Sequence, residues 1–239
     1  MEVILADYLG FCYGVKRAIH LARSSAQPGP ASTLGPIIHN PQMVSRLADE
    51  GVDAVDSLAE VPGGGTVIIR SHGVGPHVYD EAGERDLHIV DATCPHVKKA
   101  QMAAHQLFKD GREVVIIGEK KHPEVKSIFE WSGRNAVVVE TEEEAKELPP
   151  CDKLGIVAQT TFSGDKFRNI VNCLLEKSND IHIVRTICTA TDQRQKAAIE
   201  LAEKVDLMLV IGGKNSANTT RLAQLCAEKT VTHHLETAS

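Results

Sequence analysis

Three cysteines of this chain lie in similar local settings and offer thiolates that could bind one metal centre. They are Cys12 in GFCYGVKRA, Cys94 in DATCPHVKKA and Cys188 in RTICTATDQRQ, each between an apolar run and a segment compatible with a helix. Because the three positions are far apart in the sequence, no local loop can bring the sulfurs together. A three-thiolate site therefore requires a folded, repeated architecture.

The spacing of these cysteines limits the metals that they could hold. Thiolates are soft ligands that select zinc or iron–sulfur clusters. Structural zinc usually has four closed ligands, and ferredoxin clusters show closely spaced cysteines; neither pattern occurs in this sequence. Three isolated cysteines could instead hold three irons of a cubane cluster and leave the fourth open to a substrate oxygen, which it would polarise as a Lewis acid.

Polar loops recur at a fixed distance after each cysteine. His39 follows Cys12 by 27 residues, and His122 and Ser216 follow the second and third cysteines by 28 residues each. A second loop follows with His72 in the first unit and Thr160 in the second. If the second loop of the third unit follows Ser216 by the same spacing, it falls at about 249 to 254. We therefore expect the third unit to be incomplete in this chain.

The histidines of the repeated loops indicate an anion site. A single loop histidine usually has no special role, and none is predicted for His20, His77, His88, His105, His182, His233 or His234. His39, His72 and His122 recur in equivalent loops, and together with Ser216, Asn218 and backbone N–H groups at helix N-termini they suit a phosphate group. Since the formal net charge is −6, the pocket must be locally positive.

Glu124 is the one carboxylate within this set of loops. It is either a helix N-terminal acid favoured by the helix dipole or a proton donor whose pKa is raised beside an enclosed anion. Gln159 and Thr160 could relay that proton or orient the ligand, or could be ordinary polar residues at a strand end. We expect Cys173 and Cys226, on helical apolar stripes, to be structural, and Cys151, which follows a Pro-Pro turn, to be incidental.

Short apolar runs alternate with amphipathic helical patterns along the whole chain. This alternation predicts an α/β fold in three units with mostly parallel sheets and right-handed crossovers. The predicted buried strands are 3–7, 66–71, 87–91, 113–119, 136–140, 154–159, 181–186 and 207–213, and the predicted helices include 15–24, 97–108, 165–176, 194–204 and 218–228. The site is expected beyond the carboxyl ends of the strands.

Composition narrows the class of protein further. No long Lys/Arg block is present, so a nucleic-acid partner is not expected. No segment approaches the roughly 20 apolar residues of a membrane span, and we expect a cytoplasmic protein without a membrane partner. Thiols stay reduced in that compartment, which favours ligand or catalytic roles over disulfides. The cysteines themselves are the predicted unit boundaries, giving 1–93, 94–187 and 188–239.

Taken together, the motifs resemble one family along essentially the whole chain. GFCYGVKRAI, IIHNP, SHGV, DATCP, HPEV, QTT, ICTATDQRQ and GGKNSANTTRL resemble, in order, the signature blocks of the 4-hydroxy-3-methylbut-2-enyl diphosphate reductases of the methylerythritol phosphate route to isoprenoids. The resemblance implies a trefoil of three α/β units around a 4Fe-4S cluster held by Cys12, Cys94 and Cys188. The third unit is expected to be truncated.

The resemblance also implies roles for the polar loops. His39, His72, His122, Ser216 and Asn218 would bind the diphosphate, Glu124 would supply protons with His122 beside it, and Thr160 would contact the substrate. Electrons would come from ferredoxin or flavodoxin, and the products would be isopentenyl and dimethylallyl diphosphate. Members of the family continue beyond the counterpart of HHLETAS to a further serine loop, which implies that this chain is poorly stable or weakly active.

Two other classes of protein remain open from the residues. A non-catalytic iron–sulfur or diphosphate-binding module would need the cysteines but not the complete set of Glu124, Thr160 and three histidines. A cysteine-nucleophile enzyme would work without metal and would leave two equivalent cysteines unexplained.

Overall fold

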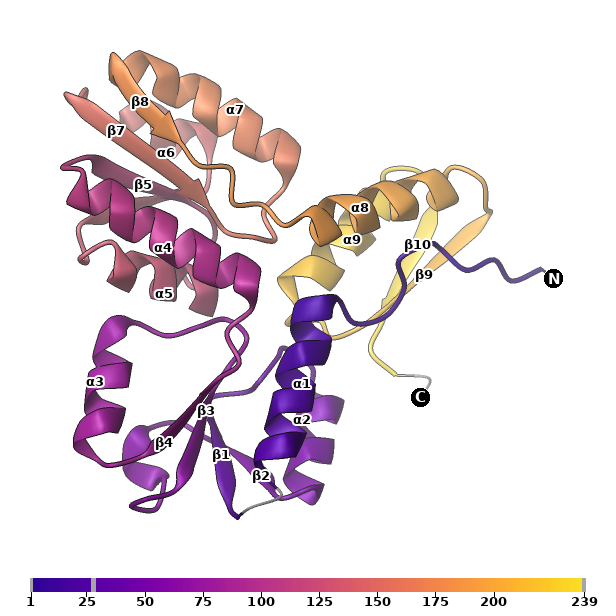
Figure 1. The fold of residues 1–239 in the computed structure, drawn as a ribbon. Coiled ribbons are helices and arrows are strands. Elements are labelled where there is room, and N and C mark those ends of the chain that lie inside the picture. The colour runs from indigo at the N-terminus through magenta and orange to yellow at the C-terminus, as the bar shows by residue number, and fades with distance from the viewer. Residues whose placement is uncertain (1, 27–28, 238–239) are drawn as a thin grey trace.

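The computed structural model describes residues 2–26 and 29–237 and consists of three α/β lobes around a common centre (Figure 1). Each lobe contains one parallel sheet. The helices α1, α4 and α8, which open the three lobes, all begin near the centre and run outward (Figure 1). The α/β prediction with parallel sheets is therefore confirmed.

The first two lobes repeat the same order of strands and α-helices, with one exception. The first comprises α1 Tyr13–Ser25, β1 Ala31–Leu34, α2 Pro41–Asp49, β2 Val52–Val55, η1 Leu58–Glu60, β3 Thr66–Ile69, α3 Pro76–Glu84 and β4 His88–Asp91. The second comprises α4 Pro95–Lys109, β5 Glu113–Ile117, α5 Pro123–Trp131, β6 Ala136–Val139, α6 Glu142–Glu147, β7 Lys153–Ala158, α7 Gly164–Leu174, η2 Leu175–Lys177 and β8 Asp180–Ile183. Helix η1 of the first lobe stands where the second has α6, and η2 occurs only in the second. The third comprises α8 Thr189–Ala202, β9 Leu207–Ile211, α9 Ala217–Ala227 and β10 Val231–Leu235.

Sheet topology shows the repeat most directly. The strand order is β2-β1-β3-β4 in the first sheet and β6-β5-β7-β8 in the second, which is the same order relative to the start of each unit. Within the described residues, the third sheet is the pair β10-β9, which corresponds to the first two strands of that order. The division at Cys94 and Cys188 into three domains stays a prediction.

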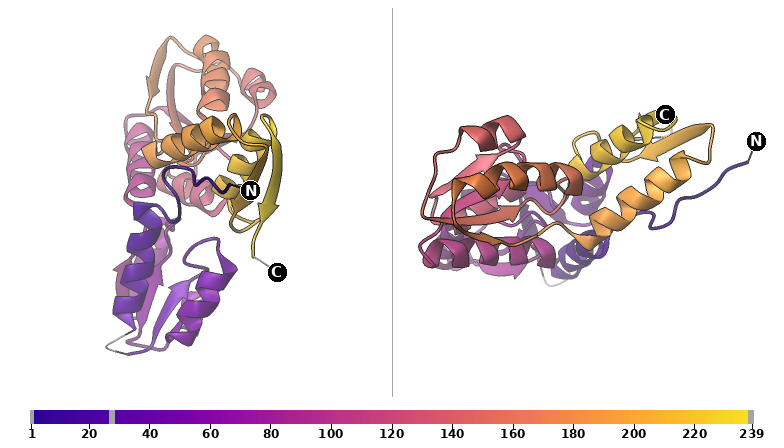
Figure 2. Two further views of the ribbon diagram at one scale, coloured as in Figure 1. Left: turned by 90° about the vertical axis from the view of Figure 1, so that its right-hand side faces the viewer. Right: turned by 90° about the horizontal axis from the view of Figure 1, so that it is seen from above.

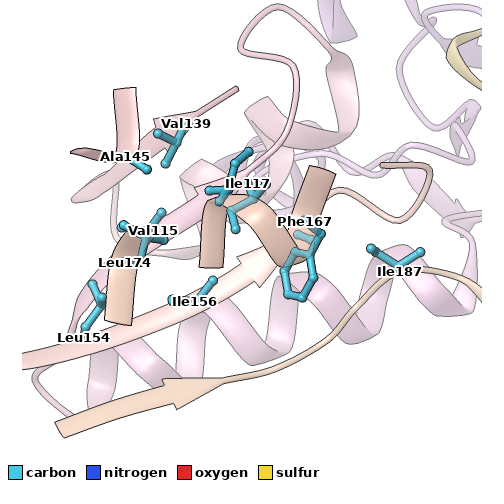
Figure 3. Close-up of a cluster of buried hydrophobic side chains, with 11 residues drawn as sticks. Val115, Ile117, Val139, Ala145, Leu154, Ile156, Phe167, Leu174 and Ile187 are labelled. Atoms are coloured by element: carbon cyan, nitrogen blue, oxygen red, sulfur yellow. The ribbon is translucent and has the colours of Figure 1, made fainter. Parts of the chain in front are cut away.

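The cores form between each sheet and its helices. In the second lobe, Val115, Ile117 and Ile156 of the sheet pack with Phe167 and Leu174 of α7 (Figure 3). These strand residues are 3% exposed or less, as expected for apolar runs in a sheet covered by helices. Cys226 of α9 is fully buried in the third core, and Cys173 packs at the edge of the second, in keeping with structural roles.

The predicted strand at residues 3–7 is wrong. This segment forms no strand and projects from the body before α1 (Figure 2). Val3, Ile4 and Leu5 are 76%, 51% and 72% exposed. An apolar run suits a strand, but a strand also needs a neighbour for its backbone hydrogen bonds, and none of the described strands pairs with these residues.

The prediction that every apolar run is buried on both faces is also wrong for β9. Met208 and Val210 face the third core, whereas Leu207, Leu209 and Ile211 are 49%, 52% and 70% exposed. Helices α8 and α9 supply the contacts on the inner face. The outer face has no covering helix within the described residues, so a continuous apolar run becomes a strand with one open face.

No helix within residues 2–26 and 29–237 is both long enough and apolar enough to cross a membrane.

Candidate active site

Each of the three predicted metal-binding cysteines stands immediately before a helix. Cys12, Cys94 and Cys188 are the N-caps of α1, α4 and α8, and Cys12 and Cys188 have extended backbone conformations. In each case the cysteine carbonyl oxygen accepts a hydrogen bond from the amide four residues later, in the first helical turn. The repeated strand, loop and helix therefore place three thiols at equivalent helix starts.

Packing around the sulfurs explains why they can come together. An added Cβ on Gly14 would lie 2.5 Å from Cys94 Sγ and 4.0 Å from Cys12 Sγ. Only glycine at this position in α1 lets the second helix start approach so closely. Gly14 is a site residue that the sequence argument did not identify.

The environment of the Cys94 thiol suits a bound cation. Burial raises the pKa of the Cys94 thiol, and the Cys12 and Cys188 sulfurs raise it further, while backbone N–H groups of His96 and Val97 oppose the shift. Thiols that disfavour one another's ionisation are stabilised as thiolates by a metal placed between them. The three-cysteine donor set therefore fits an iron–sulfur centre.

The predicted histidines form a second cluster beside the cysteines. Ring centroids of His39 and His72 lie 4.3 Å apart, and those of His122 lie 5.5 Å and 5.7 Å from them. Ring nitrogens of the three lie within 4.8 Å of one another. This spacing would suit either a shared anion or a metal ion.

Hydrogen bonds leave these imidazoles available to a ligand. His122 Nδ1 accepts a hydrogen bond from Glu124 N at 3.2 Å, so in the neutral ring the proton lies on Nε2, which can donate. His39 Nε2, His72 Nδ1 and Asn218 Oδ1 are buried without a hydrogen-bond partner. Buried polar atoms are normally satisfied, and these unpaired atoms indicate that the pocket accepts a polar ligand.

The three imidazoles are neutral at physiological pH. Burial lowers the pKa of His122 to about 4 and that of His72 well below its usual value, and it also lowers the pKa of His39. In all three cases the Arg70 guanidinium lowers the pKa further. Arg70 was not singled out from the sequence, although a lone arginine directly after the apolar run of β3 is a usable signal.

Glu124 lines the same pocket and is 2% exposed. Its two carboxylate oxygens accept hydrogen bonds from Thr160 N at 2.6 Å and from Thr160 Oγ1 at 3.0 Å. Burial raises the pKa of Glu124 to about 7, with a smaller contribution from Glu119 and opposition from the two Thr160 bonds. The carboxyl group is therefore poised to exchange a proton near neutral pH.

Backbone hydrogen bonds join the cysteines to the polar loops. Cys94 N donates to Ser71 O, next to His72, and Cys188 N donates to Thr160 O. Arg194 of α8 donates to Gly10 O, two residues before Cys12. Gln159 accepts from Glu119 N and donates to Thr161 Oγ1, which orients the strand end that carries Thr160.

One cavity of 470 Å³ contains the complete predicted set. Its walls come from all three lobes and also include Asp7, Asn40, His96, Arg194 and Glu236, which the sequence argument did not assign. The predicted residues that line it are Cys12, Cys94, Cys188, His39, His72, His122, Glu124, Thr160, Ser216 and Asn218. The structure thus brings together a thiol cluster, a histidine cluster and a buried acid.

This fold and site define a class of three-lobed α/β protein with a three-cysteine centre facing a polar ligand pocket. Residues 3–239 match the LytB protein family, and the chain belongs to that family. The LytB proteins are iron–sulfur reductases.

Relatives with an assigned function match this chain over its whole length. It is 50% identical over 240 residues to the 4-hydroxy-3-methylbut-2-enyl diphosphate reductase of Geobacter metallireducens and 48% identical over 241 residues to that of Citrifermentans bemidjiense. Both matches cover 100% of this chain and 85% of the relative.

Solved structures give the same result. A structure of (E)-4-hydroxy-3-methyl-but-2-enyl diphosphate reductase, described as the terminal enzyme of the non-mevalonate pathway, has 43% identity and a TM-score of 0.78, covering 99% of this chain and 86% of that one. The Plasmodium falciparum reductase structure has 30% identity and a TM-score of 0.88, covering 95% of this chain and 74% of that one. The trefoil prediction is confirmed.

Proposed function

We propose that this chain reduces 4-hydroxy-3-methylbut-2-enyl diphosphate to isopentenyl diphosphate and dimethylallyl diphosphate. The observation that carries the proposal is the single cavity in which three cysteines, three histidines and one buried acid meet. Relatives that share about half of its residues are named as reductases of this substrate. The reaction replaces a hydroxyl group by hydrogen, consumes two electrons and two protons, and releases water.

Cys12, Cys94 and Cys188 would hold a 4Fe-4S cluster through three irons. When bound, the cluster would supply electrons one at a time and an open iron that acts as a Lewis acid on the substrate hydroxyl group. The fit rests on the donor set and on Gly14, whose missing Cβ leaves room for Cys94 Sγ.

The histidine cluster would bind the diphosphate. His122 would donate through Nε2, since Nδ1 already accepts the bond from Glu124 N. The unpaired His39 Nε2 and His72 Nδ1 would also meet the anion as N–H donors. Ser216, the N-cap of α9, and Asn218 in its first turn would add donors from the third lobe, where the helix dipole favours negative charge.

Glu124 would deliver the protons. Its pKa of about 7 allows it to be protonated in a large share of molecules at neutral pH, and bound diphosphate would raise that pKa further because like charges disfavour ionisation. Thr160 would orient the carboxyl group through its two hydrogen bonds and contact the substrate.

The two electrons must come from a separate one-electron donor. We propose ferredoxin or flavodoxin in the cytoplasm, which follows from the family resemblance of the sequence motifs.

Anaerobic reconstitution tests this function. Iron and sulfide are counted per chain in wild type, Cys94→Ser and the control Cys151→Ser, and turnover of the diphosphate substrate by a reduced viologen is followed on the same samples. About four irons per chain and turnover in wild type and Cys151→Ser, both lost in Cys94→Ser, are expected. A cluster without turnover favours a non-catalytic module, whereas turnover without iron favours cysteine nucleophile chemistry and contradicts the proposal.

A further inference from the structure

We infer that Arg70 is the fixed positive charge of the histidine pocket and makes that pocket select an anion over a metal ion. This inference rests on the proposed function, because it concerns the diphosphate at the same histidines. Three clustered imidazoles are also a common metal-binding arrangement, and their spacing here would admit a metal ion. A positive side chain behind them disfavours a second cation and favours an anion.

Arg70 has an unusual environment for an arginine. It is half-buried, its Nε is enclosed without a hydrogen-bond partner, and burial lowers its pKa. None of the ion pairs formed within the described residues includes it. Buried charges are normally paired, so the structure leaves this guanidinium with a charge that a bound anion can balance.

The local backbone is shaped to hold Arg70 in this position. Strands β1 and β3 are paired with Leu34 opposite Ile69, so Gly35 and Arg70 follow at the same sheet edge. Gly35 has a positive φ of 71°, and a Cβ added to it would lie 2.8 Å from Arg70 Nη1. The guanidinium therefore occupies space that any other residue at position 35 would take.

Charges around the pocket make Arg70 important for anion binding. The titratable groups that face the imidazoles are the other imidazoles of the cluster and Arg70. The same cavity also contains the acids Asp7, Glu124 and Glu236 and the cation Arg194. Burial and Arg70 lower the pKa values of all three imidazoles, so Arg70 supplies positive charge that does not depend on histidine protonation.

Loss of Arg70 should therefore produce a pH-dependent defect. Burial, the largest cause of the low imidazole pKa values, remains without the guanidinium, but one opposing positive charge is gone, so these pKa values rise in part. A bound anion can then bring a proton to a histidine more readily at pH 6 than at pH 8. A unit charge pair separated by about 7 to 10 Å at an effective dielectric of about 20 changes binding roughly 15- to 50-fold, which sets the scale of the effect at pH 8.

The test uses the reconstituted holoenzyme and two readouts. KM and kcat are measured with the diphosphate substrate, and the Kd of inorganic diphosphate is measured by calorimetry, each at pH 6 and pH 8. In Arg70→Met, both KM and Kd should rise roughly 15- to 50-fold at pH 8 and clearly less at pH 6, with kcat within about threefold of wild type. The ionisation of the diphosphate also changes with pH, and this effect cancels when each constant of a variant is divided by the wild-type constant at the same pH.

Three further variants separate charge from structure. Arg70→Lys should recover most of the affinity, and Gly35→Ala should weaken binding because it displaces the guanidinium. Arg46→Met, the same substitution on exposed α2 of the same lobe, should leave both constants unchanged. Equal losses in Arg70→Met and Arg70→Lys, an equal loss at both pH values, or unchanged constants would overturn the inference. Absence of turnover in iron-loaded wild type would instead refute the proposed function, and the diphosphate Kd would still test Arg70.

Discussion

Replacement of Glu124 by glutamine should remove the pH dependence that this residue imposes on stability. The carboxyl group titrates near 4.5 when exposed and near 7 in the folded protein. Between these values the folded state binds the proton more tightly than the unfolded state does. The free energy of unfolding therefore falls as the pH rises from 4.5 to 7, and the whole decrease is present above that range.

The magnitude follows from single-site linkage. For these two pKa values, the wild-type free energy of unfolding falls by about 2.5 kcal/mol between pH 5 and pH 8 because of this group alone. A neutral glutamine has no such dependence, and its amide oxygen can still accept the bond from Thr160 N. The stability of Glu124→Gln relative to wild type should therefore rise by about 2.5 kcal/mol across this range.

Anaerobic urea unfolding of both proteins at pH 5, 6, 7 and 8 measures this difference, and other titrating groups cancel in the comparison. Glu84→Gln, an exposed glutamate of α3, is the matched control and should run parallel to wild type. Parallel curves for Glu124→Gln and wild type would refute the reasoning, because they would mean that burial does not hold the carboxyl group in its protonated form.

Glu124→Gln should also lower activity, because glutamine cannot donate the proton that the carboxyl group supplies. Loss of a general acid lowers the rate by about 10²- to 10⁴-fold, so kcat of Glu124→Gln should fall by that factor while iron content stays unchanged. In wild type, kcat/KM should decline above about pH 7 as the acid of the free enzyme loses its proton, and kcat should decline at a higher pH because bound diphosphate raises the Glu124 pKa.

Other parts of the site and fold give further predictions. Thr160→Val removes a hydrogen bond that lowers the Glu124 pKa, so the alkaline decline of kcat should move to higher pH in a pH-rate profile. Gly14→Ala places a methyl group against Cys94 Sγ and should abolish iron binding in a folded protein, whereas Gly83→Ala, where a Cβ meets nothing within 4 Å, should retain iron. Leu209→Gln on the open face of β9 should change the free energy of unfolding by less than about 0.5 kcal/mol; a large loss of stability would show that this face is covered.

The repeat was the part of the fold that could be predicted from sequence. Because each polar loop follows its cysteine at nearly the same spacing, these residues occupy equivalent positions in equivalent units. Parallel strands then place those positions at the carboxyl edge of each sheet. The strands that were missed are short and contain polar residues: ASTL in β1, VDAV in β2 and VTHHL in β10. Strand β1 lies between β2 and β3, so its conformation is imposed by pairing on both sides, which local composition does not encode.

Gly14 and Arg70 were not predicted from the sequence, for the same physical reason. Gly14 matters because Cys94, 80 positions away, approaches it. Arg70 matters because Gly35 leaves space for its guanidinium and because His39 and His122 come from other loops. The types and spacing of residues along the sequence can predict ligands. The space and charge that distant segments supply to a site depend on the folded structure and cannot be predicted in this way.

Differences within the repeat explain how a threefold frame can support a reaction on an asymmetric substrate. The three cysteines occupy equivalent helix starts, as a cluster held at three corners requires. Two residues after each repeated polar position, however, the chain has Pro41, Glu124 or Asn218. Only the second unit places an acid there, and Thr160 of the same unit orients it. Protons should therefore reach a bound ligand from the second lobe, whereas the proposed diphosphate site draws on loops of all three lobes.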